Sequence, residues 1–143
     1  ASGRSLMPRF PDRKEKRMYQ DPYKVLGVSP DATDEEIKKR NKAIKQATYI
    51  AIESPYNIMS LSLDAIRLCV DLVEHGNINA ISDLACGVIF LEAAIQSAAL
   101  NVQINLSMLD EEERNEWSSK MNSILDESHE LKESIVNQVK NIL

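Results

Sequence analysis

The sequence of 143 residues is poor both in helix breakers and in the residues that carry most enzymatic chemistry. It has 4 glycines and 5 prolines, so long helices meet few interruptions. Aromatic residues make up 5%, which is few for a surface that stacks nucleic-acid bases. The 2 cysteines and 2 histidines form no Cys-x-x-Cys pair and no Cys–His cluster. We therefore expect no metal site and no nucleic-acid partner.

Signals for membrane insertion and for secretion are also weak. The first residues contain no apolar signal-peptide core. The apolar segment 84–100 is short for a membrane span and is interrupted by Glu92 and Gln96, so we expect a buried helix and no membrane partner. Cys69 and Cys86 each lie in an apolar run, which favours buried thiols in a reducing compartment and a cytoplasmic protein.

Charge is divided unevenly along the chain. Residues 1–50 contain 12 Lys or Arg and 7 Asp or Glu, whereas residues 51–143 contain 5 and 15. We interpret residues 1–29 as a flexible basic leader and residues 30–143 as one helical domain. With 43% hydrophobic residues the chain is able to bury a core.

Apolar residues recur with helical spacing, and no segment alternates as a strand does, so the sequence predicts an all-α fold of long antiparallel helices. Thr33 and Glu36 form a capping box at the start of a helix over 34–53. Pro55 is expected to end that helix and start another, which Gly76 ends by adopting a positive φ.

Two later helices complete the predicted bundle. The segment 84–100 is apolar on all sides, so the other helices of one chain would cover it poorly, and we expect a homo-oligomer, for example a homodimer. Asp110 starts the last helix, because acidic residues stabilise helix N-termini. That helix carries a seam at nearly seven-residue spacing: Trp117, Met121, Ile124, Ser128, Leu131, Ile135 and Ile142.

The segment from Asp21 to Lys39, which reads DPYKVLGVSPDATDEEIKK, resembles the start of a J-domain co-chaperone. That family continues to a His-Pro-Asp loop, which activates its heat-shock chaperone partner. Here His75 is followed by Gly and His129 by Glu, so the loop is absent from the sequence. A J-domain-like co-chaperone is therefore the third candidate function. The sequence lacks the His-Pro-Asp residues on which the activity of that family depends.

Two longer segments are more specific. They read GNINAISD over residues 76–83 and NVQINL over residues 101–106, and an Ala-rich stretch separates them. Together with AIESP at residues 51–55, they resemble the cyclodeaminase/cyclohydrolase family of folate enzymes, from about residue 30 to the end. That family includes the C-terminal domain of formiminotransferase-cyclodeaminase and methenyltetrahydrofolate cyclohydrolase. The family's Gly-rich N-terminal segment and its acidic helix have no counterpart in this sequence.

The resemblance implies a cyclodeaminase (a lyase) or a cyclohydrolase (a hydrolase) that acts on a tetrahydrofolate derivative, its substrate. Both reactions pass through a tetrahedral carbon and need a positioned acid or base. Asp83 is the candidate catalytic residue, because apolar residues follow it and burial would raise the pKa of its carboxyl group. The alternative, held equally, is that Ser82 and Asp83 only cap the following helix.

Five further residues are candidates for substrate binding: Ser82, Asn77, Asn79, Asn101 and Asn105. Their amide and hydroxyl groups are able to hydrogen-bond the edge of a pterin. For Asn77 and Asn79 a turn role is favoured, since asparagine tolerates left-handed φ. For Asn101 and Asn105 we favour a role in shaping the site. The hypothesis requires the two Asn-bearing segments to converge in space.

A different class of function is left open. Without the Gly-rich segment, the chain could be a non-catalytic helical oligomerisation module. Saturable heat on titration with folate would distinguish an enzyme from such a module, and stimulation of a heat-shock ATPase would identify a co-chaperone.

Overall fold

The computed structural model describes residues 27, 29 and 31–143, and divides the chain into units 1–41 and 42–143. Except for Gly27 and Ser29, the leader predicted over 1–29 lies outside the described residues. Within the first unit the predicted capping box is confirmed. The backbone N–H of Thr33 donates to Glu36 Oε2 at 2.8 Å, and the backbone N–H of Glu36 donates to Thr33 Oγ1 at 3.3 Å. Helix α2 (Asp34–His75) begins at this cap.

The prediction that Pro55 separates two helices is wrong, because α2 continues through it. Proline lacks the N–H that would donate to the carbonyl of Ala51, four residues earlier. The helix persists because Ile52 and Met59, on either side of Pro55, are fully buried. Packing of an apolar helix face supplies most of the stability of helices in proteins, so one missing bond does not end α2.

Gly76 ends α2, but by another mechanism than the one predicted. Among the described residues only Gly27 has a positive φ, so the left-handed conformation expected at Gly76 is wrong. A Cβ atom on Gly76 would instead lie 2.3 Å from the carbonyl oxygen of Leu72. The N–H of Gly76 donates to that same oxygen at 2.9 Å. The position therefore requires glycine, because a Cβ atom there would collide with the backbone of the preceding helical turn.

Three shorter elements follow α2. They are the 3₁₀ turn η1 (Ile78–Ala80), helix α3 (Ile81–Leu106) and helix α4 (Glu111–Ile142). As predicted, Asp110 stands at the start of α4, and the structure adds that its side chain caps the helix by accepting the N–H of Glu113 at 3.0 Å. No strand occurs in the described residues, so the all-α class is confirmed.

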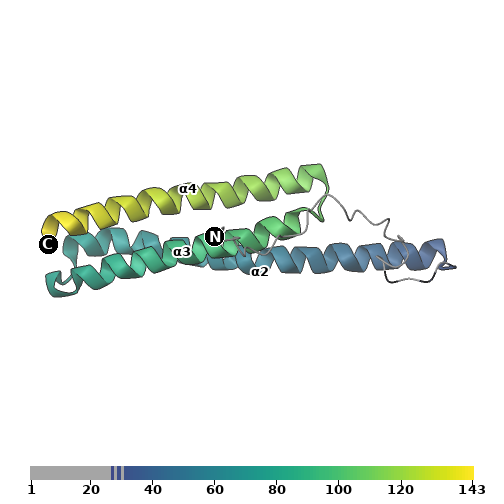
Figure 1. Ribbon diagram of the computed structural model, residues 1–143, viewed down its shortest axis with the longest axis horizontal. Helices are drawn as coiled ribbons and strands as arrows, with labels where there is room; N and C mark the ends of the chain where they lie inside the picture. Colours follow the sequence, from purple (N-terminus) through teal and green to yellow (C-terminus); the bar gives the residue numbers. More distant parts are fainter. Residues whose placement is uncertain (1–26, 28, 30) are drawn as a thin grey trace, which may run out of the picture. The chain divides into compact units, whose positions relative to one another are not determined.

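Within residues 42–143 the three helices lie side by side (Figure 1). Residue numbers rise in the same direction along α2 and α4 where these two helices contact each other. Tyr56 packs edge-to-face on Trp117, with ring centroids 5.2 Å apart, and Arg67 forms a two-pronged ion pair with Glu127 at 2.7 and 2.8 Å. Helices α2 and α4 are therefore parallel, and α3 runs antiparallel between its two connections.

The core of this unit is built from one face of each helix. Its fully enclosed side chains include Ile52, Met59, Ile66, Val88, Ile95, Val102 and Ile135. The seam predicted on α4 is mostly confirmed, since Met121, Ile124, Ser128 and Ile135 are buried and Trp117 and Leu131 are half-buried. Ile142, the last member of that seam, is 44% exposed.

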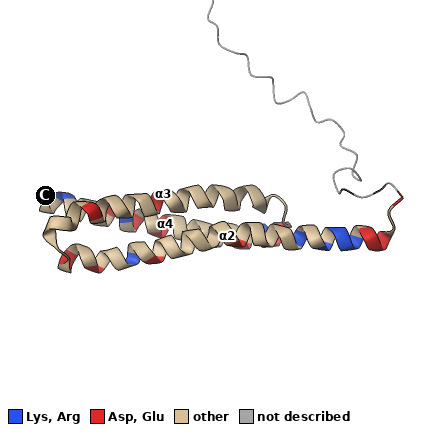
Figure 2. Cartoon of the chain, turned by 90° about the horizontal axis from the view of Figure 1, so that it is seen from below, with Lys and Arg blue, Asp and Glu red and all other residues tan. Residues whose placement is uncertain are grey.

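Two apolar ridges remain uncovered. The α2 ridge consists of Ile58, Leu61, Leu68 and Leu72, which are 50–71% exposed. The α3 ridge consists of Phe90, Leu100 and Ile104, which are 68–75% exposed, on a helix that is uncharged over nearly its whole length (Figure 2). By length and composition alone, Ile78–Leu106 would be able to cross a membrane, and 22% of its most apolar window is buried in the described unit. The prediction that the other helices of one chain cover the segment 84–100 poorly is therefore confirmed for the described unit.

Candidate functional site

The first group of predicted site residues lies where the chain passes from α2 to α3. Asn77 caps η1, and its side-chain oxygen accepts the N–H of Asn79 at 3.0 Å. The backbone of Asn77 is extended, with φ at −74° and ψ at 118°. Asn77 therefore stabilises the turn through its side-chain hydrogen bond and not through a left-handed backbone conformation. A hollow of about 150 Å³ borders Asn77, with apolar walls that include Leu72 and Leu84. It is smaller than the pockets of about 300 Å³ or more that hold drug-sized ligands.

Ser82 and Asp83 occupy the first turn of α3, and both are exposed. The burial expected for Asp83 is therefore wrong within this chain, because its side chain points away from the three-helix core. The alternative that these two residues cap α3 is not met either, since Ala80 holds the N-cap position and makes no side-chain bond there. The catalytic role of Asp83 stays a prediction.

Asn101 and Asn105 lie one turn apart near the end of α3. The side-chain amide of Asn101 donates to the carbonyl of Ser97 at 3.1 Å. The side-chain nitrogen of Asn105 donates to the carbonyl of Asn101 at 2.8 Å and to the carbonyl of Ala51, on α2, at 3.4 Å. The Ala51 carbonyl is the one that Pro55 leaves without a helical donor. Asn105 thus compensates for a proline in another helix, which is a structural role.

The two Asn-bearing segments do not converge within one chain. Asp83 and Asn105 stand near opposite ends of the single helix α3. At the rise of an α-helix, their Cα atoms are roughly 33 Å apart. A cleft that joins them would need a second copy.

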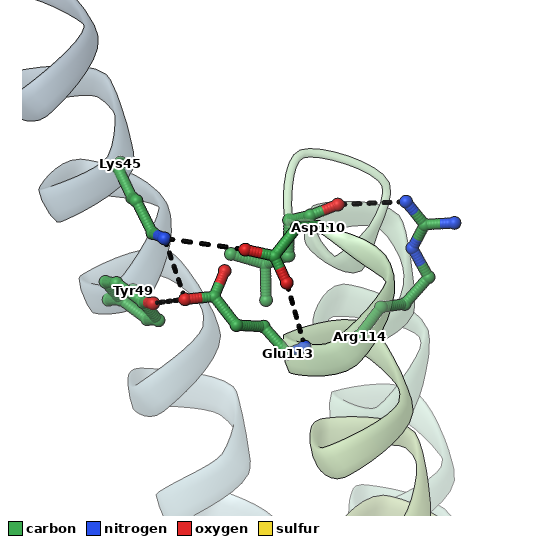
Figure 3. Close-up of polar contacts among 6 residues, drawn as sticks. Lys45, Tyr49, Asp110, Glu113 and Arg114 are labelled. Carbon is green, nitrogen blue, oxygen red and sulfur yellow. Dashed lines mark hydrogen bonds and ion pairs between the residues drawn. The ribbon is translucent and has the colours of Figure 1, made fainter.

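A polar network that the sequence analysis missed joins α2 to the start of α4 (Figure 3). Lys45 Nζ lies 2.8 Å from Glu113 Oε1 and 3.7 Å from Asp110 Oδ2. The hydroxyl of Tyr49 donates to the same oxygen of Glu113. The only local signal for this network is the i, i+4 spacing of Lys45 and Tyr49, because Glu113 is far away in the sequence.

The network strongly favours the ionised form of Glu113. Hydrogen bonds from Lys45 and then Tyr49 lower the pKa of Glu113 from 4.5 to about 2, and the bond to Glu113 raises the pKa of Lys45. The same carboxylate raises the pKa of the Tyr49 hydroxyl. A carboxylate with so low a pKa is a weak base at neutral pH. The network therefore fixes α2 against α4 and is a poor candidate for proton transfer.

Metal binding has no support in the part of the chain that the structure describes. No group of three or more His, Cys, Asp or Glu side chains there is arranged to hold a metal ion. Cys69 is half-buried and Cys86 is exposed, and neither forms a disulfide. The burial expected for Cys86 is therefore wrong, because its position on α3 faces outward.

Comparison with known proteins gives one family. The family described as formiminotransferase-cyclodeaminase matches residues 16–123. A methenyltetrahydrofolate cyclohydrolase from Methylorubrum extorquens is 34% identical over 112 residues, which cover 78% of this chain and 54% of that protein. A formimidoyltransferase-cyclodeaminase from Gallus gallus is 34% identical over 100 residues, which cover 69% of this chain and 18% of that protein. The chain thus spans about half the length of the first relative and a smaller part of the second.

Proposed function

The chain belongs to the formiminotransferase-cyclodeaminase family, and on that basis we propose that it takes part in folate one-carbon chemistry. The proposed activity is that of a formiminotetrahydrofolate cyclodeaminase or a methenyltetrahydrofolate cyclohydrolase, with a tetrahydrofolate derivative as substrate. The observation that carries the proposal is the match over residues 16–123. We place the activity in the cytoplasm, on the argument from the unpaired cysteines.

Both candidate reactions work on the carbon that bridges N5 and N10 of tetrahydrofolate. In the cyclohydrolase reaction water adds to the methenyl carbon, and in the cyclodeaminase reaction N10 adds to the formimino carbon and ammonia leaves. In each case the nucleophile loses a proton as the carbon becomes tetrahedral, so a base near the reacting carbon accelerates the reaction. Asp83 is the candidate base that the family resemblance suggested.

Absorbance of 5,10-methenyltetrahydrofolate tests the activity. The purified chain should accelerate loss of this absorbance above the spontaneous rate, and release of ammonia from the formimino substrate would identify the deaminase instead. An Asp83→Asn variant should lose about 10²-fold or more if Asp83 moves the proton. No acceleration of either reaction would overturn the proposal for this chain.

A non-catalytic oligomerisation module is the second candidate function, and the roughly 33 Å between Asp83 and Asn105 favours it. Such a module would keep the packing of the family without its chemistry. Calorimetric titration with tetrahydrofolate separates the two functions, because the module should give no saturable heat. Saturable binding to the wild-type chain would eliminate it.

We also propose that the chain forms a homo-oligomer, of which a homodimer is the simplest form. The α2 ridge and the α3 ridge support it. Ile58, Leu61, Leu68 and Leu72 are spaced by three, seven and four residues, which is the repeat of a seam between packed helices. A two-fold axis can place such a ridge against its own copy, because an isologous interface uses the same patch twice.

Light scattering during size-exclusion chromatography tests this proposal. The wild-type chain should elute as an oligomer, and a Leu68→Glu variant should shift toward the monomer mass. Leu68 is 71% exposed, so the substitution leaves the core of one chain intact. A Glu53→Lys variant, which changes an exposed charge outside the ridge, is the matched control. A monomeric wild-type chain at high concentration would contradict the proposal.

A further inference from the structure

A groove of about 540 Å³ lies between α3 and α4, and its lining includes none of the candidate catalytic and substrate-binding residues from the sequence. Its walls combine apolar and polar side chains. Ala99, Leu100, Met121 and Leu125 supply apolar surface, and Glu92 and Gln96 supply polar groups. A volume in this range is large enough for a drug-sized ligand, and the groove is open to solvent along one side.

Glu92 is the notable member of this lining. It is 8% exposed and is the only buried charged residue among those described. Its Oε1 accepts the side-chain N–H of Gln96 and lies 4.0 Å from His129 Nδ1. Its Oε2 accepts no hydrogen bond from the described part of the chain. This oxygen is not among the buried side-chain atoms that lack a hydrogen-bond partner, so solvent reaches it from the groove. A ligand in the groove is therefore able to donate to Oε2 or to place positive charge beside it.

The charges around the groove favour a cation. Asp126 and Glu130 add two carboxylates to its lining. The cationic groups that face Glu92 are His129 on the rim and Lys132, whose pKa is raised first by its contact with Glu133 and in smaller part by Glu92. Three carboxylates against these two groups leave the groove net negative when His129 is neutral. A flat cation with apolar edges suits both the charge and the Ala99–Leu100 wall.

We propose that this groove binds the cationic one-carbon unit of the folate substrate and that Glu92 accepts the proton from the attacking nucleophile. The inference rests on the proposed function. The methenyl bridge is an amidinium cation, and a formimino group is an amidine that becomes the same kind of cation when protonated. Either would place its positive charge against Glu92 Oε2, with Gln96 holding the other oxygen in place.

The step is balanced for each reaction. In the hydrolysis, the oxygen of water forms a bond to the methenyl carbon while Glu92 takes one of its protons. The electron pair of the carbon–nitrogen π bond moves onto nitrogen, which gives a neutral tetrahedral carbon. In the cyclisation, N10 forms the bond and gives its proton to Glu92 instead. When the tetrahedral carbon collapses, Glu92 returns that proton to the departing nitrogen. In the cyclisation ammonia leaves and the bridge becomes the methenyl cation. In the hydrolysis the carbon–N5 bond breaks, and the hydroxyl group releases its own proton to solvent as its oxygen becomes the formyl carbonyl.

Glu92 meets the requirements that were expected of Asp83. Its side chain is mostly buried, an amide donates to one carboxylate oxygen, and the groove borders the carboxylate. Asp83 is exposed, and the groove lining does not include it. In the sequence Glu92 appears only as an interruption of an apolar helix. A single carboxylate in such a helix is the one sequence feature that could have indicated its role.

Binding tests the charge preference without requiring turnover. Stopped-flow tryptophan fluorescence should show that the wild-type chain binds cationic 5,10-methenyltetrahydrofolate about tenfold or more tightly than 5-formyltetrahydrofolate, whose one-carbon unit is an uncharged formyl group on N5. Glu92→Gln should reduce this preference to about threefold or less, and Glu53→Gln should leave it unchanged. An unchanged preference in a folded Glu92→Gln chain would overturn the inference.

Two further measurements keep the inference separate from the proposed function. Glu130→Gln changes an exposed residue on the rim of the groove, so this variant should fold normally. It should weaken the preference for the cationic folate by a smaller factor than Glu92→Gln does. The inference can therefore still be tested if the Glu92→Gln chain does not fold. Turnover should fall about 10²-fold or more in Glu92→Gln and stay near wild type in Glu53→Gln, which changes an exposed carboxylate outside the groove. If the wild-type chain neither binds nor turns over folate, the proposed function fails. If it does both and Glu92→Gln does so equally well, only the groove assignment fails.

Discussion

At the scale of single residues, Pro55 and Asn105 form a pair across two helices. Pro55 leaves the carbonyl of Ala51 without its usual donor, and the side-chain nitrogen of Asn105 approaches that carbonyl at 3.4 Å. The contact is at the long end of hydrogen-bond distances, so its contribution to stability is modest. It explains why AIESP and NVQINL occur together in one sequence, since each segment supplies one partner.

A double-mutant cycle should reveal this pair. Asn105→Ala should destabilise the chain by about 0.5–1.5 kcal/mol, because a carbonyl loses its donor. In a Pro55→Ala background the new alanine restores the backbone N–H, so the same Asn105 substitution should cost less. Urea unfolding of the four chains measures the difference. Equal costs in both backgrounds would show that Asn105 does not compensate for the proline.

The Glu113 network predicts a particular acid response. The pKa of Glu113 is about 2 in the folded chain and near 4.5 when unfolded, so the folded state binds fewer protons between these values. The stabilisation is complete above about pH 4.5 and is lost as the pH falls toward 2. Urea midpoints between pH 5 and 2.5 should therefore fall less steeply in Glu113→Gln than in wild type. Glu112→Gln, next to it on the exposed first turn of α4, should keep the wild-type slope.

Residue roles were harder to predict from the sequence than residue positions. The caps at Thr33 and Asp110 were predictable because each involves atoms within three residues. The Lys45–Glu113 contact and the burial of Glu92 depend on which helix faces pack together, and no local pattern encodes that. The choice of Asp83 failed on burial for the same reason, since apolar neighbours in sequence do not determine which side of α3 faces the core.

At the scale of elements, helix identity followed from spacing and composition, while one boundary did not. Pro55 is a strong breaker by intrinsic preference, yet Ile52 and Met59 hold α2 together around it. The break at Gly76 was predictable, although its cause was not. Local preference thus located the helices, and tertiary packing decided whether a breaker acted.

Two glycines should respond in opposite directions to alanine. Gly76→Ala would place a Cβ 2.3 Å from the Leu72 carbonyl oxygen, so it should destabilise the chain by about 1–3 kcal/mol. Gly87 lies inside α3, where an added Cβ would meet nothing within 4 Å, so Gly87→Ala should stabilise by about 0.5–1 kcal/mol. Thermal unfolding followed by circular dichroism compares the two. A stabilising Gly76→Ala would contradict the close approach at this turn.

At the scale of the whole molecule, the α2 and α3 ridges predict that stability depends on protein concentration. An oligomer that buries them stabilises the folded state by mass action. The unfolding temperature of the wild-type chain should therefore rise over a hundredfold increase in concentration, whereas that of Leu68→Glu should rise less. Scanning calorimetry at several concentrations measures both. A wild-type unfolding temperature that does not change with protein concentration would show that no second copy covers the ridges.

The up-down-up order of the three helices in residues 42–143 has a consequence for attachment. Because α4 runs parallel to α2, Lys42 lies at one end of this unit and Leu143 at the other, and α4 alone is roughly 48 Å long. Fluorescent labels or fusion partners joined at the two ends would be held apart by the rod between them. The unit would then serve as a spacer of fixed length, and energy transfer between such labels would report its integrity.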